Sequence, residues 1–145
     1  MFPAATASFF LIVASVFVHY EVLMRLNQWL PRLRRIPARA RVLAAMLGTL
    51  VSHFSQIALF AFAYFVLRDR FGLGGFDGQF QDSFTVFLYF SAETYTSLGL
   101  GDLVPLGPLR LVTGIESLTG LLSISWTASF TFLEMSRFWG RTQEG

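Results

Sequence analysis

The chain contains neither cysteine nor lysine, and it is poor in charge. Without cysteine it has no disulfide framework and no thiolate to bind a metal ion. Charged residues make up 14% of the 145 residues and hydrophobic residues 54%, a balance too apolar for a soluble domain of this size. The composition therefore predicts a single small membrane domain. All eleven basic residues are arginines, a usage associated with GC-rich bacterial genomes, so a bacterial inner membrane is the expected location.

The first long apolar run covers residues 2–24, which is enough for one membrane span of about 20 residues. No basic segment precedes this run and no clear small-residue cleavage site follows it, so we expect an uncleaved anchor rather than a signal peptide. Residues 1–41 are therefore predicted to form an N-terminal transmembrane helix and a basic connector.

More than half of the arginines crowd into this connector, around Pro31 and Pro37. The positive-inside rule places the connector in the cytoplasm and the N-terminus outside. Arginines that gather beside apolar runs, rather than among polar recognition residues, argue against a nucleic-acid partner. We interpret them as an orientation signal. The alternative is a site for anionic lipid headgroups at Arg32, Arg34 and Arg35.

The second apolar run covers residues 42–67 and is predicted to be the next span. His53 and Gln56 interrupt it one turn apart, so they share a helix face that should be turned toward protein. A hydrogen-bonded structural role is expected for His53, because no second histidine stands at metal-ligand spacing and His19 lies on another helix.

Residues 68–79 are rich in glycine and carry balanced charge, as an extracellular turn region would. Asp82 or Ser83 is placed to cap a short helix predicted over about 83–96. This helix is too short to cross a bilayer, so it should enter and return. Its C-terminal end, at Thr96, would point the negative end of the helix dipole at the membrane centre, where a cation needs compensation.

The stretch that follows is Ser97-Leu98-Gly99-Leu100-Gly101-Asp102, in which glycines alternate with other residues. Glycine relieves the steric block on positive φ, so successive carbonyl oxygens can turn to one side as a ladder. Such oxygens can replace the water shell of an ion. Non-helical backbone at this depth must line water or be buried in protein, and one chain has too few helices to enclose it. A homotetramer around a central axis therefore follows.

This stretch resembles the pore signature of the potassium channel family, Thr-Val-Gly-Tyr-Gly-Asp. Its flanks, Ser91-Ala92-Glu93-Thr94 and Leu103-Val104-Pro105, resemble those of the small bacterial proton-gated potassium channels, and the resemblance covers about residues 80–139. It implies a selectivity filter over 97–102, preceded by Thr96, and no cofactor besides the permeant K⁺. The implied ion ligands are the carbonyl oxygens of Ser97, Leu98, Gly99, Leu100 and Gly101.

The resemblance also implies that Glu93 and Asp102 share a proton behind the filter and brace it. Like-charged neighbours raise the pKa of one member of such a pair, so one carboxyl would be neutral and would donate to the other. Both residues would then support the filter rather than catalyse a reaction.

Gly107-Pro108 restarts a helix over 108–139, which is predicted to be the inner helix of a pore domain covering 42–145. Its small and polar residues suit close packing and a wet cavity. Gly120 matches the family's hinge glycine and fits a packing glycine equally well. Phe132 is a candidate hydrophobic gate, although packing is the commoner role of an aromatic side chain. The family alignment turns five residues toward the axis: Leu121, Ile124, Ala128, Phe132 and Ser136.

Two further acids lie inside predicted spans. Glu134 falls near the cytoplasmic boundary, where an ion pair with Arg39 or Arg41 is expected. Glu116 lies deeper, and the sequence indicates no partner for it.

Three alternatives remain. Gly99-Leu100-Gly101-Asp102 also resembles the signature of intramembrane aspartyl proteases, but that chemistry needs a second aspartate within a span, and the others lie in the outer loop. A non-conducting membrane protein with a pore loop is a second alternative. The third is a weakly selective cation channel, because Leu100 lacks a phenol that could anchor the filter to Tyr89, Phe90 and Tyr95.

The sequence thus predicts an all-α membrane protein with three transmembrane helices, one re-entrant pore helix and a filter loop in a tetrameric pore. Its predicted function is that of a passive cation channel, most simply a potassium-selective one, and not that of an enzyme.

Overall fold

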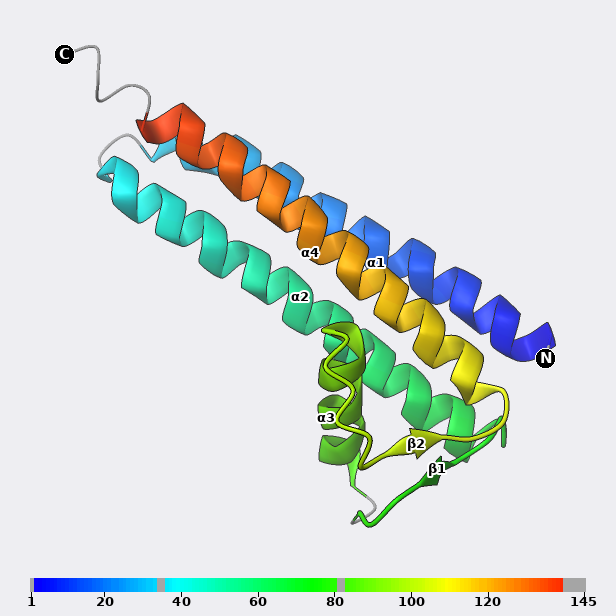
Figure 1. Ribbon diagram of the computed structural model, residues 1–145. Coiled ribbons are helices and arrows are strands. Elements are labelled where there is room, and N and C mark those ends of the chain that lie inside the picture. The colour runs from blue at the N-terminus through cyan, green and yellow to red at the C-terminus, as the bar shows by residue number, and fades with distance from the viewer. Residues whose placement is uncertain (1, 34–35, 81–82, 140–145) are drawn as a thin grey trace.

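The computed structural model describes residues 2–33, 36–80 and 83–139. Three long helices lie side by side, and a short helix lies obliquely against two of them near one end of the bundle (Figure 1). In chain order the elements are α1 (Phe2–Trp29), the 3₁₀ turn η1 (Leu30–Arg32), α2 (Ala38–Asp69), β1 (Phe76–Asp77), α3 (Phe84–Tyr95), β2 (Val104–Pro105) and α4 (Leu109–Trp139). The N-terminus lies at the end of the bundle that carries the strands, and α4 ends at the opposite end (Figure 1).

Helix length separates the three bundle helices from α3. They contain 28, 32 and 31 residues, or roughly 42–48 Å at 1.5 Å per residue. With 12 residues α3 is about 18 Å long, well short of the ~30 Å hydrocarbon core of a bilayer. In the described chain, α1 with η1 and α2 are long and apolar enough to cross a membrane. The third long helix, α4, is more polar, with serine or threonine at every second position from Ser123 to Thr131.

The helix boundaries differ from those expected wherever arginines flank an apolar run. α1 continues to Trp29 instead of ending at Met24, and α2 covers Ala38–Asp69 instead of 42–67. Arginine is a good helix former, so loss of hydropathy does not end a helix. Instead, α1 ends shortly before Pro31, and α2 begins directly after Pro37. α3 and α4 agree with the expected 83–96 and 108–139 to within one residue at each end.

α1 packs against both α2 and α4 through a narrow stripe of mostly small or polar side chains. The buried residues of this stripe are Ala4, Ser8, Ser15, His19 and Leu23. The opposite face is apolar and exposed, as Phe9 and Phe17 illustrate. α1 is therefore a packed part of the bundle and exposes a lipid-compatible surface.

The main hydrophobic core lies where α3 meets α2, α4 and the start of α1. Phe90 packs edge-on against the rings of Tyr64 and Phe76, with centroids 5.2 and 4.8 Å apart. The buried members of this cluster are Ala4, Phe60, Ala61, Tyr64, Leu67, Phe87, Phe90, Leu103, Leu109 and Val112. This aromatic packing fixes the position of α3 in the bundle.

The only strands among the described residues are two-residue segments, a small addition to the expected all-α fold. β1 and β2 pair antiparallel, with Phe76 opposite Pro105. A Cβ on Gly78 would lie 2.2 Å from the carbonyl oxygen of Asp102, and Gly78 also has a φ of 138°. Glycine is therefore required where the outer turn region crosses the chain that leaves the predicted filter.

Candidate functional site

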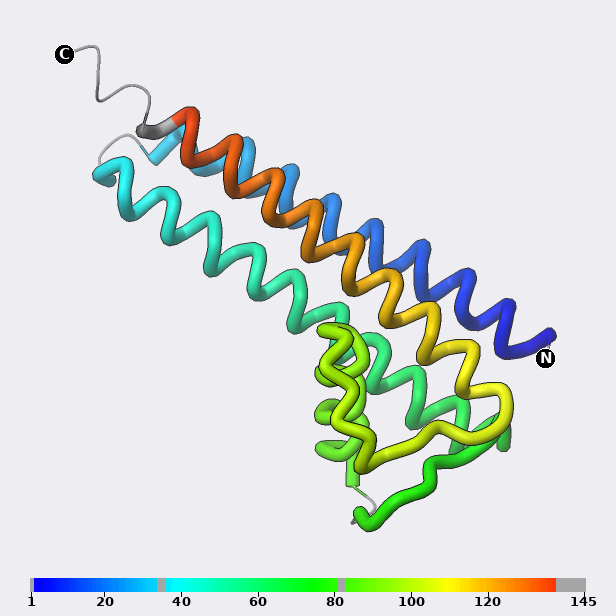
Figure 2. The backbone as a smooth tube through the Cα atoms, in the orientation of Figure 1, coloured from blue at the N-terminus to red at the C-terminus, as the bar shows by residue number. Residues whose placement is uncertain are grey.

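The chain turns back on itself after α3. Figure 2 shows the segment after α3 returning alongside that helix before it enters β2. Ser83 stands at the N-cap of α3 in an extended conformation but forms no side-chain cap, and Asp82 lies outside the described residues. At the other end, the hydroxyl of Thr96 donates to the carbonyl of Ala92, 2.8 Å away, and satisfies one of the last carbonyls of the helix.

Left-handed backbone recurs at every second residue of the returning loop. The φ angles are 58° at Ser97, 57° at Gly99 and 81° at Gly101. Gly99 and Gly101 adopt this region at no steric cost, whereas Ser97 is the only described non-glycine residue with positive φ. The hydroxyl of Ser97 lies 2.8 Å from that of Ser117, which ties the start of the loop to α4.

The amide groups of this loop point toward α3 and converge on Glu93. The amides of Leu98 and Gly99 donate to the carbonyl oxygen of Glu93 at 2.8 and 3.4 Å. The amide of Leu100 donates to the Glu93 carboxylate at 3.1 Å. Within the described parts of the chain, no group donates to the carbonyl oxygens of residues 97–101, so these oxygens are not committed to the protein's own hydrogen bonding.

Glu93 and Asp102 both lie near Tyr89 but have different main hydrogen bonds in the structure. Glu93 is buried and accepts from the loop, whereas Asp102 is exposed and accepts a hydrogen bond from the Tyr89 hydroxyl at 2.9 Å. That hydrogen bond is the main cause that raises the pKa of Tyr89 to about 12. The hydrogen bond therefore contributes fully to the stability of the fold below the ordinary tyrosine pKa of about 10. This contribution is lost as the pH rises through the raised pKa. The sequence indicated Glu93 and Asp102 but not Tyr89 as the donor to Asp102.

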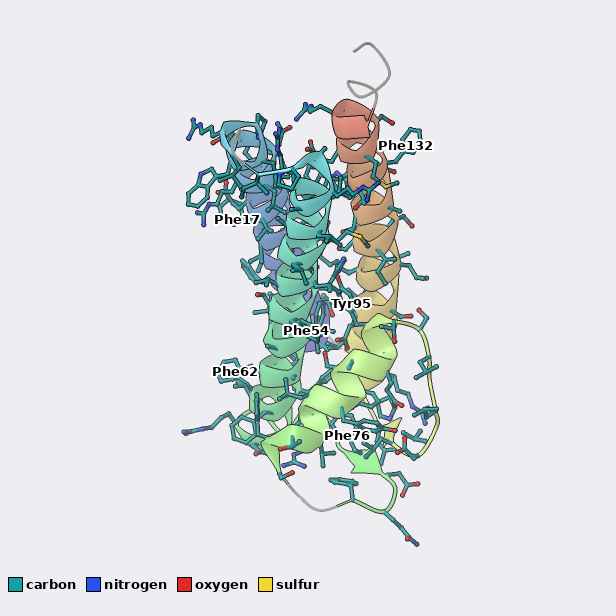
Figure 3. The ribbon with its side chains drawn as sticks, turned by 90° about the vertical axis from the view of Figure 1, so that its left-hand side faces the viewer. Phe17, Phe54, Phe62, Phe76, Tyr95 and Phe132 are labelled. Atoms are coloured by element: carbon teal, nitrogen blue, oxygen red, sulfur yellow. The ribbon has the colours of Figure 1, made fainter. Side chains whose placement is uncertain are left out.

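Gly120 lies where α4 crosses the end of α3. A Cβ on Gly120 would lie 2.0 Å from the carbonyl oxygen of Tyr95, closer than any side chain allows. The residue thus has the packing role that was one of its two expected functions. Phe132, the candidate gate, lies further along α4 with 68% of its surface exposed in the single chain, and Figure 3 shows it on the outside of the bundle.

The two acids on α4 have partners that the sequence did not reveal. Glu116 is fully buried and accepts hydrogen bonds from Tyr64 on α2 and Ser91 on α3. Glu134 was expected to pair with Arg39 or Arg41, but it pairs instead with Arg137, one turn away on α4, at 2.9 Å. The i,i+3 spacing brings these two side chains together on one helix face.

A second polar cluster surrounds the two histidines. Gln56 is buried, as expected from the shared face, and His53 bonds Tyr95 at 2.8 Å. His19 lies on another helix, as expected, but its imidazole centroid is only 5.3 Å from that of His53. Sequence spacing gave no indication of this, because the contact depends on how α1 is rotated against α2.

A helix too short to span, followed by a loop with alternating left-handed residues and uncommitted carbonyl oxygens, is the arrangement expected of an ion channel. A family model described as "Ion channel" matches residues 52–136, more than half of the chain. The chain therefore belongs to this family and is a membrane channel protein, not an enzyme, which removes the protease alternative. α1 lies wholly before the matched segment.

The chain is also similar to the inward rectifier potassium channel Kirbac3.1 of Paramagnetospirillum magnetotacticum. The two are 38% identical over 82 residues, which are 55% of this chain and 26% of that protein. The chain thus aligns with about a quarter of the length of this relative. No solved structure matches the chain. The family and this relative confirm the resemblance to the potassium channel pore family.

Proposed function

We propose that the chain is one subunit of a homotetrameric potassium channel of the cell membrane. Two observations together support this proposal. The backbone φ is positive at every second residue, Ser97, Gly99 and Gly101, and the amides of the loop donate hydrogen bonds to Glu93. The carbonyl oxygens of residues 97–101 are left to replace the hydration shell of K⁺. Transport is passive, and no cofactor takes part.

Four copies are needed to complete the site. Residues 96–102 are exposed in the single chain, and carbonyl oxygens from one loop surround an ion on one side only. Four loops around an axis would surround it fully. The exposed apolar side chains of α4, such as Leu122 and Leu133, supply surface for the neighbouring copies and for lipid. The polar residues of α4 suit a helix that lines water.

In this arrangement α1, α2 and α4 span the membrane and α3 enters it and returns. Arg32, Arg39 and Arg137 lie near the end of the bundle opposite the strands, which supports a cytoplasmic location for that end and an outside N-terminus. Anionic lipid headgroups are proposed to bind near Arg32, while Arg34 and Arg35 lie outside the described residues. Gly120 as a hinge and Phe132 as a dewetting gate belong to the same proposal.

The test is the reversal potential of purified protein in a planar bilayer, with K⁺ on one side and Na⁺ on the other. Reversal near the K⁺ equilibrium potential is expected. Reversal near zero would favour the weakly selective channel that Leu100 suggests, and the absence of current would favour a non-conducting protein.

Two glycine variants provide a matched comparison. Gly99→Ala places a Cβ on a residue with φ of 57° and no neighbour within 4 Å, so it strains only the loop backbone. Gly75→Ala also meets nothing within 4 Å and has no positive φ. We expect Gly99→Ala to abolish the K⁺-selective current and Gly75→Ala to retain it. Equal currents from the two variants would reject the loop as the ion pathway.

A further inference from the structure

Tyr95 is the last residue of α3 and stands two positions before the first residue of the predicted filter. Its side chain is 1% exposed, and its backbone carbonyl lies against Gly120 of α4. Its hydroxyl lies 2.8 Å from Nδ1 of His53 on α2. Figure 3 labels Tyr95 where the end of α3 meets α2 and α4. A shift of this side chain would therefore be passed to the filter over only two residues of chain.

The contacts of His53 continue to α1. Nε2 of His53 lies 2.9 Å from the Thr127 hydroxyl on α4, and Nε2 of His19 lies 3.4 Å from the same oxygen. On its other side, Nδ1 of His19 lies 3.0 Å from the Ser52 hydroxyl and 3.2 Å from the amide nitrogen of Gln56. An unbroken series of hydrogen bonds thus joins α1 to the end of the pore helix.

Gln56 indicates which atoms donate and which accept at the start of this series of hydrogen bonds. The side-chain oxygen of Gln56 accepts from two hydroxyl donors, those of Ser15 and Ser123, so its amide nitrogen faces His19. An amide nitrogen only donates, and Nδ1 of His19 must therefore accept. The imidazole hydrogen of His19 is then on Nε2 and is directed to Thr127.

One assignment of the later bonds continues this direction along the series. Thr127 has one hydroxyl hydrogen and two acceptor lone pairs, so it can accept from Nε2 of His19 and donate its hydrogen to Nε2 of His53. The hydrogen of His53 is then on Nδ1 and is donated to the Tyr95 hydroxyl oxygen. The two histidines therefore carry their hydrogens on opposite ring nitrogens.

We propose that α1 positions the selectivity filter, because His19 and Thr127 fix the tautomer and ring orientation with which His53 holds Tyr95. This inference rests on the proposed function. It makes His19, Thr127 and His53 positioning residues for ion selectivity, although none of them contacts the ion. It also gives α1, which lies outside the segment matched by the family, a role in the pore.

The first measurement is nitrogen NMR of the full-length protein labelled with ¹⁵N-histidine in lipid. The chain contains only 2 histidines, so the spectrum holds two imidazoles, which the His19→Phe variant assigns. We expect hydrogen on Nε2 of His19 and on Nδ1 of His53. The same tautomer at both residues would overturn the proposal.

The second measurement is the reversal potential of Thr127→Val, which removes the hydroxyl and preserves side-chain shape. We expect a several-fold fall in the K⁺ to Na⁺ permeability ratio of Thr127→Val and an equal fall in His19→Phe. The double variant should show no further fall, because both substitutions act through the same series of hydrogen bonds. Thr119→Val is the control, since the Thr119 hydroxyl bonds only the carbonyl of Ile115 on its own helix. It should leave the ratio unchanged.

An unchanged ratio in assembled Thr127→Val tetramers would overturn the proposal. If Thr127→Val does not assemble, His19→Phe provides the deciding measurement by the same criterion. If the wild type carries no selective current, the proposed function fails, and the tautomers alone then decide whether α1 is coupled to Tyr95.

Discussion

Glu93 holds the loop over residues 97–102 through two different groups. Its backbone carbonyl accepts from Leu98 and Gly99, and its carboxylate accepts from Leu100. One residue near the end of α3 therefore orients three consecutive amides, and the intervening carbonyls must turn the other way. Because the carbonyl contribution is independent of the side chain, substitution of Glu93 should release mainly the part of the loop near Leu100.

Tyr89→Phe tests the role of Asp102, the second carboxylate of the loop. The variant keeps the ring and removes the hydrogen bond to Asp102, so current should decay faster when external K⁺ is low. Since the pKa of Tyr89 is raised to about 12, the difference from wild type should not change across the neutral and mildly alkaline range. Time courses of current in bilayers provide the measurement. The control is Tyr20→Phe on α1, and equal decay in the two variants would contradict the role of Tyr89.

Glu116 allows a test of buried hydrogen bonding. Glu116→Gln retains an acceptor for Tyr64 and Ser91, whereas Glu116→Leu leaves both hydroxyls without this partner. Tyr64 keeps the Thr113 hydroxyl at 3.3 Å and Ser91 keeps the Ile57 carbonyl at 2.8 Å, so each lost bond costs about 0.5–1.5 kcal/mol rather than the full penalty of an unpaired group. Thermal unfolding should therefore show a much larger loss of stability for Glu116→Leu than for Glu116→Gln. Equal losses would mean that side-chain volume, rather than hydrogen bonding, determines the effect.

At the scale of elements, the crossing of α3 and α4 depends on one missing side chain. Gly120→Ala would force the helices apart at Tyr95, and overpacking of this kind costs roughly 1–3 kcal/mol. Gly114→Ala, on the same helix, meets nothing within 4 Å and should be neutral or stabilising by up to about 1 kcal/mol. Tetramer melting temperatures distinguish the two. A Gly120→Ala tetramer as stable as that of Gly114→Ala would show that the contact is not required.

The helices, their order and the loop were predictable because their signals are local. Apolar runs, Pro31 and Pro37 delimit α1 and α2, and the glycines at 99 and 101 mark the loop. The partners of Glu116 and the approach of His19 to His53 were not predictable, because both depend on the rotation of one helix against another. Hydropathy indicates which residues avoid lipid, but it does not indicate which of them meet.

At the scale of the whole molecule, the single chain exposes the backbone that the proposed function uses. The loop, with Leu98 at 64% and Leu100 at 60% exposed, is supported from behind by α3 and lacks a facing wall. Uncommitted carbonyl oxygens from four chains would repel one another without a cation between them.

Removal of K⁺ should therefore destabilise the tetramer. A ligand present at 100 times its dissociation constant stabilises the state that binds it by about 2.7 kcal/mol. Replacing K⁺ with choline should lower the temperature at which tetramers dissociate, and adding K⁺ back should restore it. Gly99→Ala tetramers should lack this response. A K⁺ dependence that is the same in both proteins would place the effect outside the loop.

The bond between His19 and Thr127 joins residues 108 positions apart, whereas Ser52, which also bonds His19, lies 33 positions from it. At roughly 5–20 residues per second of synthesis, α1 leaves the ribosome several seconds before α4 exists. The hairpin of α1 and α2 can satisfy one nitrogen of His19 early, but the other must wait for α4. The hydrogen bonds of His19 are thus completed only after α4 has been made, so this residue stays incompletely bonded while α2 and α3 are synthesised.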